Sequence, residues 1–545
     1  MAEGTINPWG LDFDEHGQMF MSTSVVDHLW HVVPGSKFKR WVGREIPLYP
    51  HIYDLMGPAN DHSHRPVERN AGGDATYSES DFAGGAAHSE AMIYLGDRWP
   101  ESYRGSVLMS NIHGRRINRD RLQRAGDGRY FASHEPDFLR ANDPWFRAVS
   151  FVYGPDGDVV MTDWSDFGEC HDRDGVHRNS GRIYKVSWGA PRHVPVDLSK
   201  ASVEELVALQ EHRNDWFARQ SRRLLQERAL AGVPMGTVHT ALRKMFVASQ
   251  SVIRLRALWA LYVTSGAEQA WLAGQLEHPD EHVRYWAIRL LVDGTLPSAE
   301  YATHFVRLAA DEKSWLVRMA LASALPKVDA ASRWAMGAAL ARAMNSNDDP
   351  NLIRLLWMGW QEAVAANTTG ALELAAAIRV PLLSEWTARR IAEEAGRTPA
   401  LAGRLLAAIA RGASGDVRSQ LLAGVAAGLP VRDYPIAADA FAPLRQFYDQ
   451  ERISDRMHAL AVGATLRDSE AITRLRSVLN DKRSGAAVRS DALRSLGPVQ
   501  PDWLVADLLQ LVATQQMMEP AIRALSVVED AVSYTHLTLP TNREV

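Results

Sequence analysis

The chain has 545 residues, a length that predicts about three or four structural units rather than one globule. Hydrophobic residues make up 46% and charged residues 23%, which excludes a disordered or collagen-like chain. A net charge of −5 is too balanced for a dedicated nucleic-acid binder. The single cysteine, Cys170, excludes both an internal disulfide and the CxxCH attachment of a haem. We expect no membrane span, because no apolar run approaches roughly 18 residues, and the N-terminus has no signal-peptide pattern.

Glycine and histidine divide the chain into two parts. Residues 1–192 hold 21 of the 38 glycines and 11 of the 19 histidines. Glycine serves tight turns, so its density predicts many short strands up to about Trp188. Helices should dominate the rest of the chain.

A strand, turn, strand unit recurs in the first part. The acidic turn Asp14–Gly17 joins the extended runs 9–13 and 18–21, and the turn Gly154–Gly157 joins a second pair of such runs. The turns lie 140 residues apart, and three intervals of about 47 residues, the length of a four-stranded propeller blade, would fill that distance. We therefore predict that residues 1–192 are the C-terminal blades of a partial β-propeller, about four at most, with further blades expected before Met1.

The second part is predicted to be a helical repeat. Val283, Ala287 and Leu291 fall on one helical face, and the same pattern returns one period later. The repeat carries arginines at positions 284, 318, 354, 389, 418, 456, 489 and 523. This spacing is typical of a paired-helix solenoid, and the Arg and Asp positions resemble the HEAT family, in which they form hydrogen bonds between repeats. We predict a helical linker or cap over 193–250, a HEAT/armadillo-type solenoid over 251–531 and a non-native or disordered tail over 532–545.

The first part also resembles a known enzyme family. The run 88–97 and the segment Trp145–Val149, followed by the turn at Gly154, are similar to six-bladed quinoprotein sugar dehydrogenases of the sorbosone and glucose type. The order of propeller and HEAT solenoid is similar to large bacterial membrane-bound dehydrogenase-like proteins, which often end in a haem c domain. The resemblance implies a fragment, truncated at both ends, of an extracytoplasmic or periplasmic parent protein.

That family binds pyrroloquinoline quinone (PQQ) together with calcium, and the resemblance assigns four cofactor positions. Arg147 matches a cofactor-binding arginine, Asn7 matches an asparagine before proline, and Ser89 falls at a small hydroxyl position. His113 falls where the family uses lysine. A tricarboxylate needs planar bidentate donors and calcium needs oxygen ligands, which agrees with these residue types.

The resemblance also defines an expected activity and its departures. Ile6 and Trp145 replace two arginines of the family, and the catalytic histidine belongs to a blade that this chain does not contain. The parent is expected to oxidise a sugar or alcohol and to pass electrons to an acceptor such as cytochrome c. The fragment alone is expected to be inactive.

A second candidate site is a loop rich in acidic residues. Asp163, His171, Asp172 and Asp174 lie close in sequence and form a possible metal site, with a solvated acidic loop as the alternative. His62 and His64 form a possible chelating pair, again with an ordinary loop as the alternative. The solenoid carries an aromatic series that we interpret as core packing: Trp259, Tyr285, Trp286, Trp315, Trp357 and Trp360.

An alternative function comes from a different class of protein. The propeller and the solenoid would both serve as binding surfaces of a non-catalytic scaffold for a protein or glycan. The missing cofactor arginines favour this alternative, whereas the matches at Asn7, Ser89 and Arg147 favour the enzyme. In either case the solenoid offers a surface for a protein partner.

Overall fold

The structure is a computed structural model. It describes residues 2–24, 27–39, 49–60, 88–168, 175–177, 179–293, 299–411 and 415–526. The chain divides into two compact units. The first unit comprises Met1–Leu340 with Asp348–Gly359, and the second comprises Ala341–Asn347 with Trp360–Val545.

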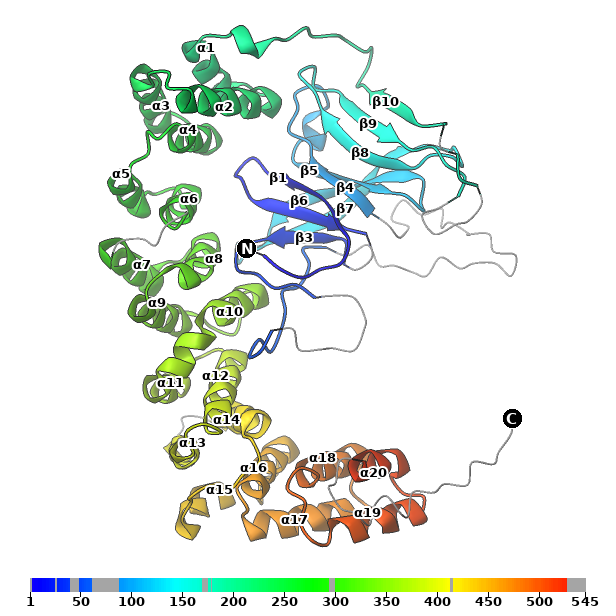
Figure 1. Cartoon of the computed structure of the whole chain (residues 1–545), viewed down its shortest axis with the longest axis vertical. Coiled ribbons are helices and arrows are strands. Elements are labelled where there is room, and N and C mark those ends of the chain that lie inside the picture. The colour runs from blue at the N-terminus through cyan, green and yellow to red at the C-terminus, as the bar shows by residue number, and fades with distance from the viewer. Residues whose placement is uncertain are drawn as a thin grey trace. The chain divides into compact units, whose positions relative to one another are not determined.

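The first unit begins with three small antiparallel sheets (Figure 1). The first sheet consists of β1 (Pro8–Phe13), β2 (Met19–Thr23) and β3 (Leu29–Val32). The second sheet consists of β4 (His88–Ile93), β5 (Ser106–Asn111), β6 (Arg116–Arg124) and β7 (Tyr130–Arg140). The third sheet consists of β8 (Ala148–Tyr153), β9 (Val159–Asp163) and β10 (Arg182–Val186). The described strands therefore form no closed sheet and no six-bladed propeller.

Both predicted strand, turn, strand units are present, and their turns are held in the same way. In the turn from β1 to β2, the Asp14 carboxylate accepts the backbone N–H groups of His16 and Gln18 at 2.9 and 2.8 Å. Gly17 closes this turn with φ +76°, a conformation that costs glycine little. In the turn from β8 to β9, Gly157 also has φ +76°, and its N–H donates to the carbonyl oxygen of Gly154 at 3.0 Å.

The three sheets stack in chain order around a shared core. A Cβ atom at Gly10 of β1 would lie 2.1 Å from the backbone nitrogen of Ala91, so β1 approaches β4 as closely as the main chain allows. The Asp12 carboxylate accepts the Ile93 N–H at 2.8 Å. On the other side of β4, the Ser89 hydroxyl donates to the Ala148 carbonyl at 3.2 Å. Each pair of neighbouring sheets is thus joined by packing and by hydrogen bonds.

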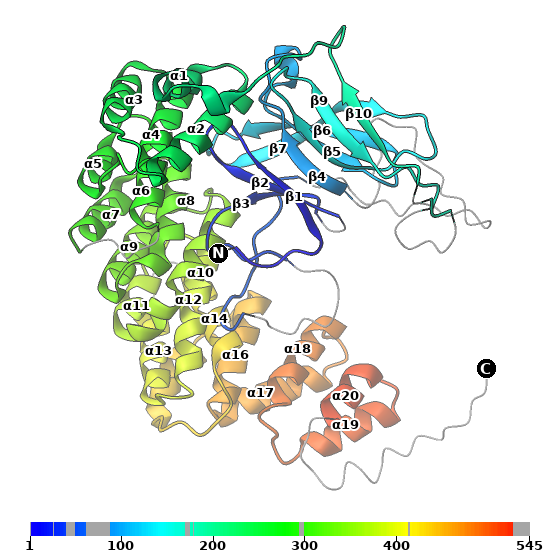
Figure 2. The same cartoon turned by 45° about the horizontal axis from the view of Figure 1, so that its top comes forward.

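Helices follow the sheets through the rest of the described chain (Figure 2). The first ten are α1 (Val203–Ala208), α2 (Asp215–Leu230), α3 (Gly236–Ala248), α4 (Ser251–Val263), α5 (Gln269–Gly274), α6 (Glu281–Leu291), α7 (Ala299–Asp311), α8 (Trp315–Ala324), α9 (Ala330–Ala343) and α10 (Pro350–Ala366). The others are α11 (Thr368–Ala375), α12 (Pro381–Glu394), α13 (Ala400–Arg411), α14 (Gly415–Gly428), α15 (Ala442–Arg445), α16 (Ile453–Thr465), α17 (Ser469–Asn480), α18 (Ala486–Leu496), α19 (Leu504–Ala513) and α20 (Met518–Leu525). None of the described helices is long and apolar enough to cross a membrane.

Alternate helices form a continuous layer in each unit, as in a solenoid. In the first unit α2, α4, α6 and α8 pack in succession, and in the second unit α12, α14, α16, α18 and α20 do so. The predicted α-helical solenoid is therefore present in both units. Because each of these helices packs on the next one in its layer, the apolar faces are buried by stacking.

Some arginines of the series link successive repeats, as the HEAT resemblance implied, whereas Arg389 and Arg523 pair with Glu393 and Glu519 of their own helices. Three ion pairs in the first unit are Arg254 to Asp280 at 3.3 Å, Arg284 to Glu312 at 2.9 Å and Arg318 to Asp348 at 3.1 Å. Arg354, the next arginine of the series, instead pairs with Asp54 at 2.7 Å. Arg354, which was predicted to bond between repeats, is thus paired with the segment that follows the first sheet.

Candidate functional site

Three of the four predicted cofactor positions lie near one another at one end of the stacked sheets. The Asn7 carbonyl accepts the Ser24 N–H at 3.1 Å, and the Ser24 hydroxyl donates to the carbonyl of His88, the neighbour of Ser89. Ser89 in turn contacts Ala148, the neighbour of Arg147. His113 is half-buried in the turn between β5 and β6.

At two of these positions, Arg147 and Ser89, the side-chain donors form hydrogen bonds with backbone carbonyls of the protein. Arg147 is fully buried, and its guanidinium donates to the carbonyls of Pro144 at 3.0 Å, Phe146 at 2.8 Å and Phe167 at 3.1 Å. Ser89 is also fully buried, with its hydroxyl on a backbone carbonyl. A quinone tricarboxylate needs cationic donors that reach the ligand. Arg147 and Ser89 therefore do not present donors to this cofactor without breaking their bonds to backbone carbonyls.

The predicted metal loop is only partly described. Asp163 is buried, accepts the backbone N–H groups of Arg147 at 2.7 Å and Ser165 at 2.9 Å, and pairs with Arg182 at 2.7 Å. This carboxylate therefore organises the end of β9. Outside the described residues lie His171, Asp172, Asp174, Cys170, His62 and His64. In the described parts of the chain, no group of three His, Cys, Asp or Glu side chains is arranged to hold a metal ion.

The structure draws attention to a different set of residues, where the helices of the first unit meet the sheets. We define the tryptophan row as Trp259, Trp286, Trp315 and Trp357, which lie one each on α4, α6, α8 and α10. The Trp286 indole N–H donates to the His16 carbonyl at 2.8 Å. A Cβ atom at Gly17 would lie 2.5 Å from the Trp286 ring and 2.8 Å from the Trp259 ring. The turn from β1 to β2 therefore packs directly against the rings of two tryptophans.

The other two tryptophans contact the segments that follow. The Trp315 ring lies 6.0 Å from the His31 ring and 6.4 Å from the Tyr130 ring, measured between centroids. The Trp357 indole donates to the His51 carbonyl at 2.8 Å. The interpretation of these aromatic residues as core packing agrees with the burial of Trp315 and Trp357. The four tryptophans in addition contact the sheets or the segment that follows the first sheet. Their recurrence on alternate helices was the signal in the sequence that could have revealed this role.

A charged network joins the first sheet to α2. Arg219 donates to the carboxylates of Asp12 and Asp215, both at 2.6 Å, and to the Phe13 carbonyl at 2.9 Å. Asp215 also pairs with Arg256 of α4 at 2.8 Å. Burial tends to raise the pKa of Asp215, but the charges of Arg219 and Arg256 hold this pKa below its ordinary value. Asp215 therefore stays ionised although it is largely enclosed.

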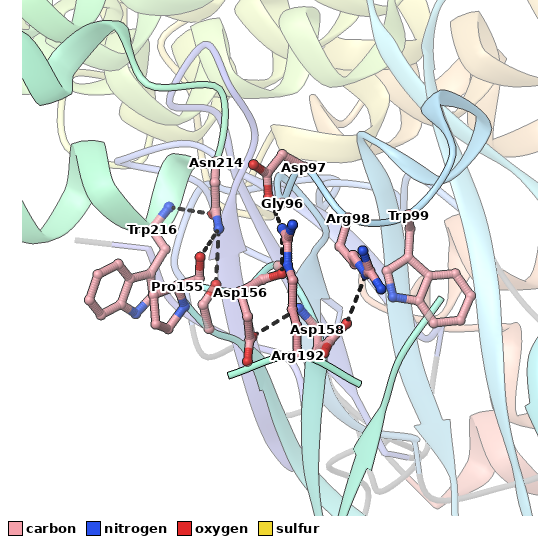
Figure 3. A network of polar contacts seen from close by, with 12 residues as sticks. Gly96, Asp97, Arg98, Trp99, Pro155, Asp156, Asp158, Arg192, Asn214 and Trp216 are labelled. Atoms are coloured by element: carbon pink, nitrogen blue, oxygen red, sulfur yellow. Dashed lines mark hydrogen bonds and ion pairs between the residues drawn. The ribbon is translucent and has the colours of Figure 1, made fainter. Parts of the chain in front are cut away.

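A second polar network fixes the third sheet to the second sheet and to α2 (Figure 3). Asn214, at the N-cap of α2, donates from its amide to the carbonyls of Gly154 at 3.0 Å and Pro155 at 3.3 Å. Arg98 lies 3.8 Å from the Asp158 carboxylate. The turn from β8 to β9 is thus tied to a helix and to the loop after β4, so its role is structural.

A small cavity of about 120 Å³ lies beside Trp315, between the sheets and α8 and α10. His31, Tyr130, Asp349 and Asn351 contribute polar groups to its lining. Burial lowers the pKa of His31 to about 3, and the charges of Arg289 and Arg124 act in the same direction. Burial also raises the pKa values of Tyr130 and Asp349. These three groups of the lining are therefore held towards their neutral forms, and Arg129 lines the cavity beside them.

The contact between His16 and His282 predicts a pH dependence of stability. The two rings stack at 3.9 Å, and burial, with a smaller contribution from the charge of His16, lowers the pKa of His282 to about 4. An unfolded histidine has a pKa near 6.5, so between pH 6.5 and 4 the unfolded state takes up a proton that the folded state does not. We expect this residue to cost about 2 kcal/mol of stability at pH 5 relative to pH 7.5.

Urea denaturation at pH 7.5 and 5.0 measures this effect, with His282→Phe as the variant that keeps an aromatic ring and cannot titrate. The variant should lose less stability on acidification than the wild type. An equal loss in both proteins would contradict the assignment to His282.

Comparisons with known proteins add little to this geometry. Residues 1–188, about a third of the chain, match a family model described as "Domain of unknown function (DUF7133)". No curated protein matches the chain.

Solved structures show only a distant likeness. The crystal structure of Kap121p is 12% identical with a TM-score of 0.39, and the match covers 60% of this chain and 42% of that one. The crystal structure of Kap121p bound to Pho4p is also 12% identical, with a TM-score of 0.37 over the same shares. An engineered protein is 17% identical with a TM-score of 0.25, and the match covers 59% of this chain and 98% of that one. The chain thus spans less than half the length of Kap121p, and at these TM-scores the likenesses carry no argument about function.

Proposed function

We propose that this chain is a non-catalytic scaffold in which the sheets and the solenoid of the first unit together present a surface for a protein partner. The observation that carries the proposal is the tryptophan row. Four successive alternate helices use their tryptophans to contact the sheets or the segment that follows the first sheet, so this face of the solenoid is already occupied by the chain itself. The binding surface that remains includes the free faces of the sheets.

A free apolar surface of this kind is present on the first sheet. Trp9, Leu11 and Phe13 alternate along β1 and are 50%, 56% and 40% exposed. Large apolar side chains that gather on one face of a soluble protein mark an interaction site more often than isolated ones do. We therefore infer that this strand contacts a partner.

The chemistry of the described residues supports a scaffold over an enzyme. The guanidinium of Arg147 and the hydroxyl of Ser89 are bound to backbone carbonyls, and Asp163 is bound to Arg182 and to backbone N–H groups. Groups used in this way stabilise the strand ends. They are not available to a substrate without breaking buried hydrogen bonds, which costs about 1–3 kcal/mol for each group left unpaired.

The competing proposal is a fragment of an extracytoplasmic quinone-dependent dehydrogenase that oxidises a sugar or alcohol. The neighbourhood of Asn7, Ser89 and Arg147 at one end of the sheets favours it. That proposal requires the chain to bind PQQ with calcium, whereas the scaffold does not.

A titration separates the two proposals. The purified chain should show no saturable change in tryptophan fluorescence or quinone absorbance when PQQ is added with calcium, and no dye reduction with sugars or alcohols. Saturable quinone binding that is lost in Arg147→Met would overturn the scaffold. Circular dichroism of that variant checks that the loss of binding is not a loss of folding.

A further inference from the structure

We propose that Arg222 of α2 and Trp259 of α4 form a binding site for a carboxylate, and that its occupant is an acidic side chain of the protein partner. The proposal rests on the scaffold function and names one contact of that partner. Two neighbouring hydrogen-bond donors without acceptors carry it.

Arg222 and Trp259 each present a buried donor that has no acceptor among the described residues. The Nη1 atom of Arg222 and the indole nitrogen of Trp259 are both enclosed, and neither forms a hydrogen bond there. The guanidinium carbon of Arg222 lies 5.2 Å from the centre of the Trp259 ring. Buried polar groups of folded proteins are normally hydrogen-bonded, so two such donors side by side indicate an acceptor that comes from elsewhere.

The carboxylates nearest to Arg222 are already used by other groups. One oxygen of Asp215 bonds to Arg219 at 2.6 Å, and the other bonds to Arg256 at 2.8 Å. Asp12 accepts from Arg219 and from two backbone N–H groups. In the described parts of the chain, no ion pair therefore joins Arg222 to either carboxylate.

One positive charge at this place is left without a counterion. Three arginines face the two carboxylates just described, and the nearby pair of Arg104 and Glu15 adds no net charge. Burial lowers the pKa of Arg222 to about 10; the charge of Asp215 opposes this shift, and the charges of the two neighbouring arginines add to it. Arg222 is therefore still protonated at neutral pH and attracts an anion.

The donors and the charge suit a carboxylate better than a phosphate or a chloride. A guanidinium offers two parallel N–H groups to the two oxygens of a carboxylate, and the indole N–H adds a third donor. One surplus positive charge matches a monoanion, whereas a phosphate ester brings about 1.5 to 2 negative charges. Chloride has the right charge but no second acceptor atom. A carboxylate therefore satisfies both donors and neutralises the site.

The position of the site favours a side chain of a protein partner as the occupant. Arg222 and Trp259 are half-buried, whereas pockets for free small ligands usually enclose about 70–90% of the ligand surface. The site also adjoins β1, the strand that we propose to contact the partner. Arg219, one turn before Arg222, donates to the Phe13 carbonyl at 2.9 Å, and a Cβ atom at Gly17 would lie 2.8 Å from the Trp259 ring.

Urea denaturation of the full chain, in sodium acetate and in sodium chloride of equal ionic strength, tests the carboxylate site. Acetate should raise the urea midpoint more than chloride does, because a ligand that binds only the folded state stabilises it. Arg222→Met should weaken acetate binding roughly tenfold or more. Arg223→Met, which removes the neighbouring exposed arginine that pairs with Glu227, is the matched control and should leave acetate binding unchanged.

Two conservative variants keep the test decisive if Arg222→Met disturbs the fold. Arg222→Lys keeps the charge but loses the paired donors, and Trp259→Phe keeps an aromatic ring but loses the N–H group. Each should weaken acetate binding about threefold or more, and denaturation without acetate shows whether each variant is folded. An acetate effect no larger than that of chloride overturns the site. So does an acetate effect that Arg222→Met leaves unchanged.

A pair of peptides distinguishes a protein side chain from a free small carboxylate. An acetylated pentapeptide of alternating leucine and glutamate, with glutamine replacing glutamate in its control, is titrated by calorimetry. Per carboxylate, the acidic peptide should bind roughly tenfold tighter than acetate, because its leucines can contact the apolar face of β1. Arg222→Met should remove the difference between the two peptides. Acidic peptide that binds no tighter than acetate, or no tighter than its control, overturns the protein side chain as occupant.

These outcomes are independent of the quinone titration. Failure of the acetate experiment removes the carboxylate site and leaves the scaffold in place. Quinone binding that is lost in Arg147→Met and kept in Arg222→Met removes the scaffold, whereas the acetate result for Arg222 still stands by itself.

Discussion

Gly17→Ala is expected to lower the free energy of unfolding by about 3 kcal/mol. Part of the loss, about 1 kcal/mol, comes from placing an alanine at a positive φ of 76°. The larger part comes from overpacking, because the new methyl group would lie 2.5 Å from the Trp286 ring and 2.8 Å from the Trp259 ring. Urea denaturation followed by tryptophan fluorescence measures the change.

Gly105→Ala is the matched control for this substitution. Gly105 has nearly the same φ, +77°, but a Cβ atom there would have no neighbour within 4 Å. It should therefore lose only the backbone part, about 1 kcal/mol. Equal losses of unfolding free energy at the two glycines would mean that the tryptophan rings move aside at no energetic cost. The turn would then not be tightly packed on the helices.

Arg219→Met is the second substitution with a large expected effect. It keeps the apolar stem of the side chain but removes the guanidinium that bridges Asp12 and Asp215. Both carboxylates are less than 10% exposed, so the loss leaves Asp12 without its cation and Asp215 with Arg256 alone. Breaking a buried ion pair in this way costs about 3 kcal/mol, to be measured by chemical denaturation.

Arg223→Met, one turn further along α2, provides the comparison. Arg223 pairs with Glu227 at 2.6 Å, but the two side chains are 58% and 52% exposed. An exposed pair of this kind contributes about 0.5 kcal/mol or less. If Arg219→Met proved no more costly than Arg223→Met, the network at Asp12 would not be what fastens the first sheet to the helices.

Local patterns predicted the individual elements of this protein well. The turn residues Asp14 and Gly17 placed β1 and β2, and the spacing of Val283, Ala287 and Leu291 placed α6, because these features depend on neighbouring residues alone. The stacking of three sheets was consistent with the predicted partial propeller, but the described strands do not close into a ring. Whether sheets close into a ring depends on contacts between segments far apart in the sequence. The local spacing of turn and apolar residues does not predict such contacts.

The junction between sheets and helices could not be predicted from the same patterns. Trp286 and Arg354 occupy ordinary repeat positions, and nothing near them in sequence shows that one meets His16 and the other Asp54. Burial explains the cofactor positions in a similar way. An arginine at position 147 has the right chemistry for an anionic ligand, but its enclosure among carbonyl groups becomes visible only in three dimensions.

The anchoring of the sheets at several separate helices has a mechanical consequence. Helical repeats joined only to their neighbours stretch and recoil like a spring, since small rotations at each step add up along the array. Here three helices are hydrogen-bonded to successive points of the N-terminal segment. Trp286 of α6 bonds to His16, Ser323 of α8 to Pro34 and Asn351 of α10 to Gly57. Stretching this part of the solenoid would therefore require the β-sheets to shear. It should resist extension and then unfold cooperatively under force.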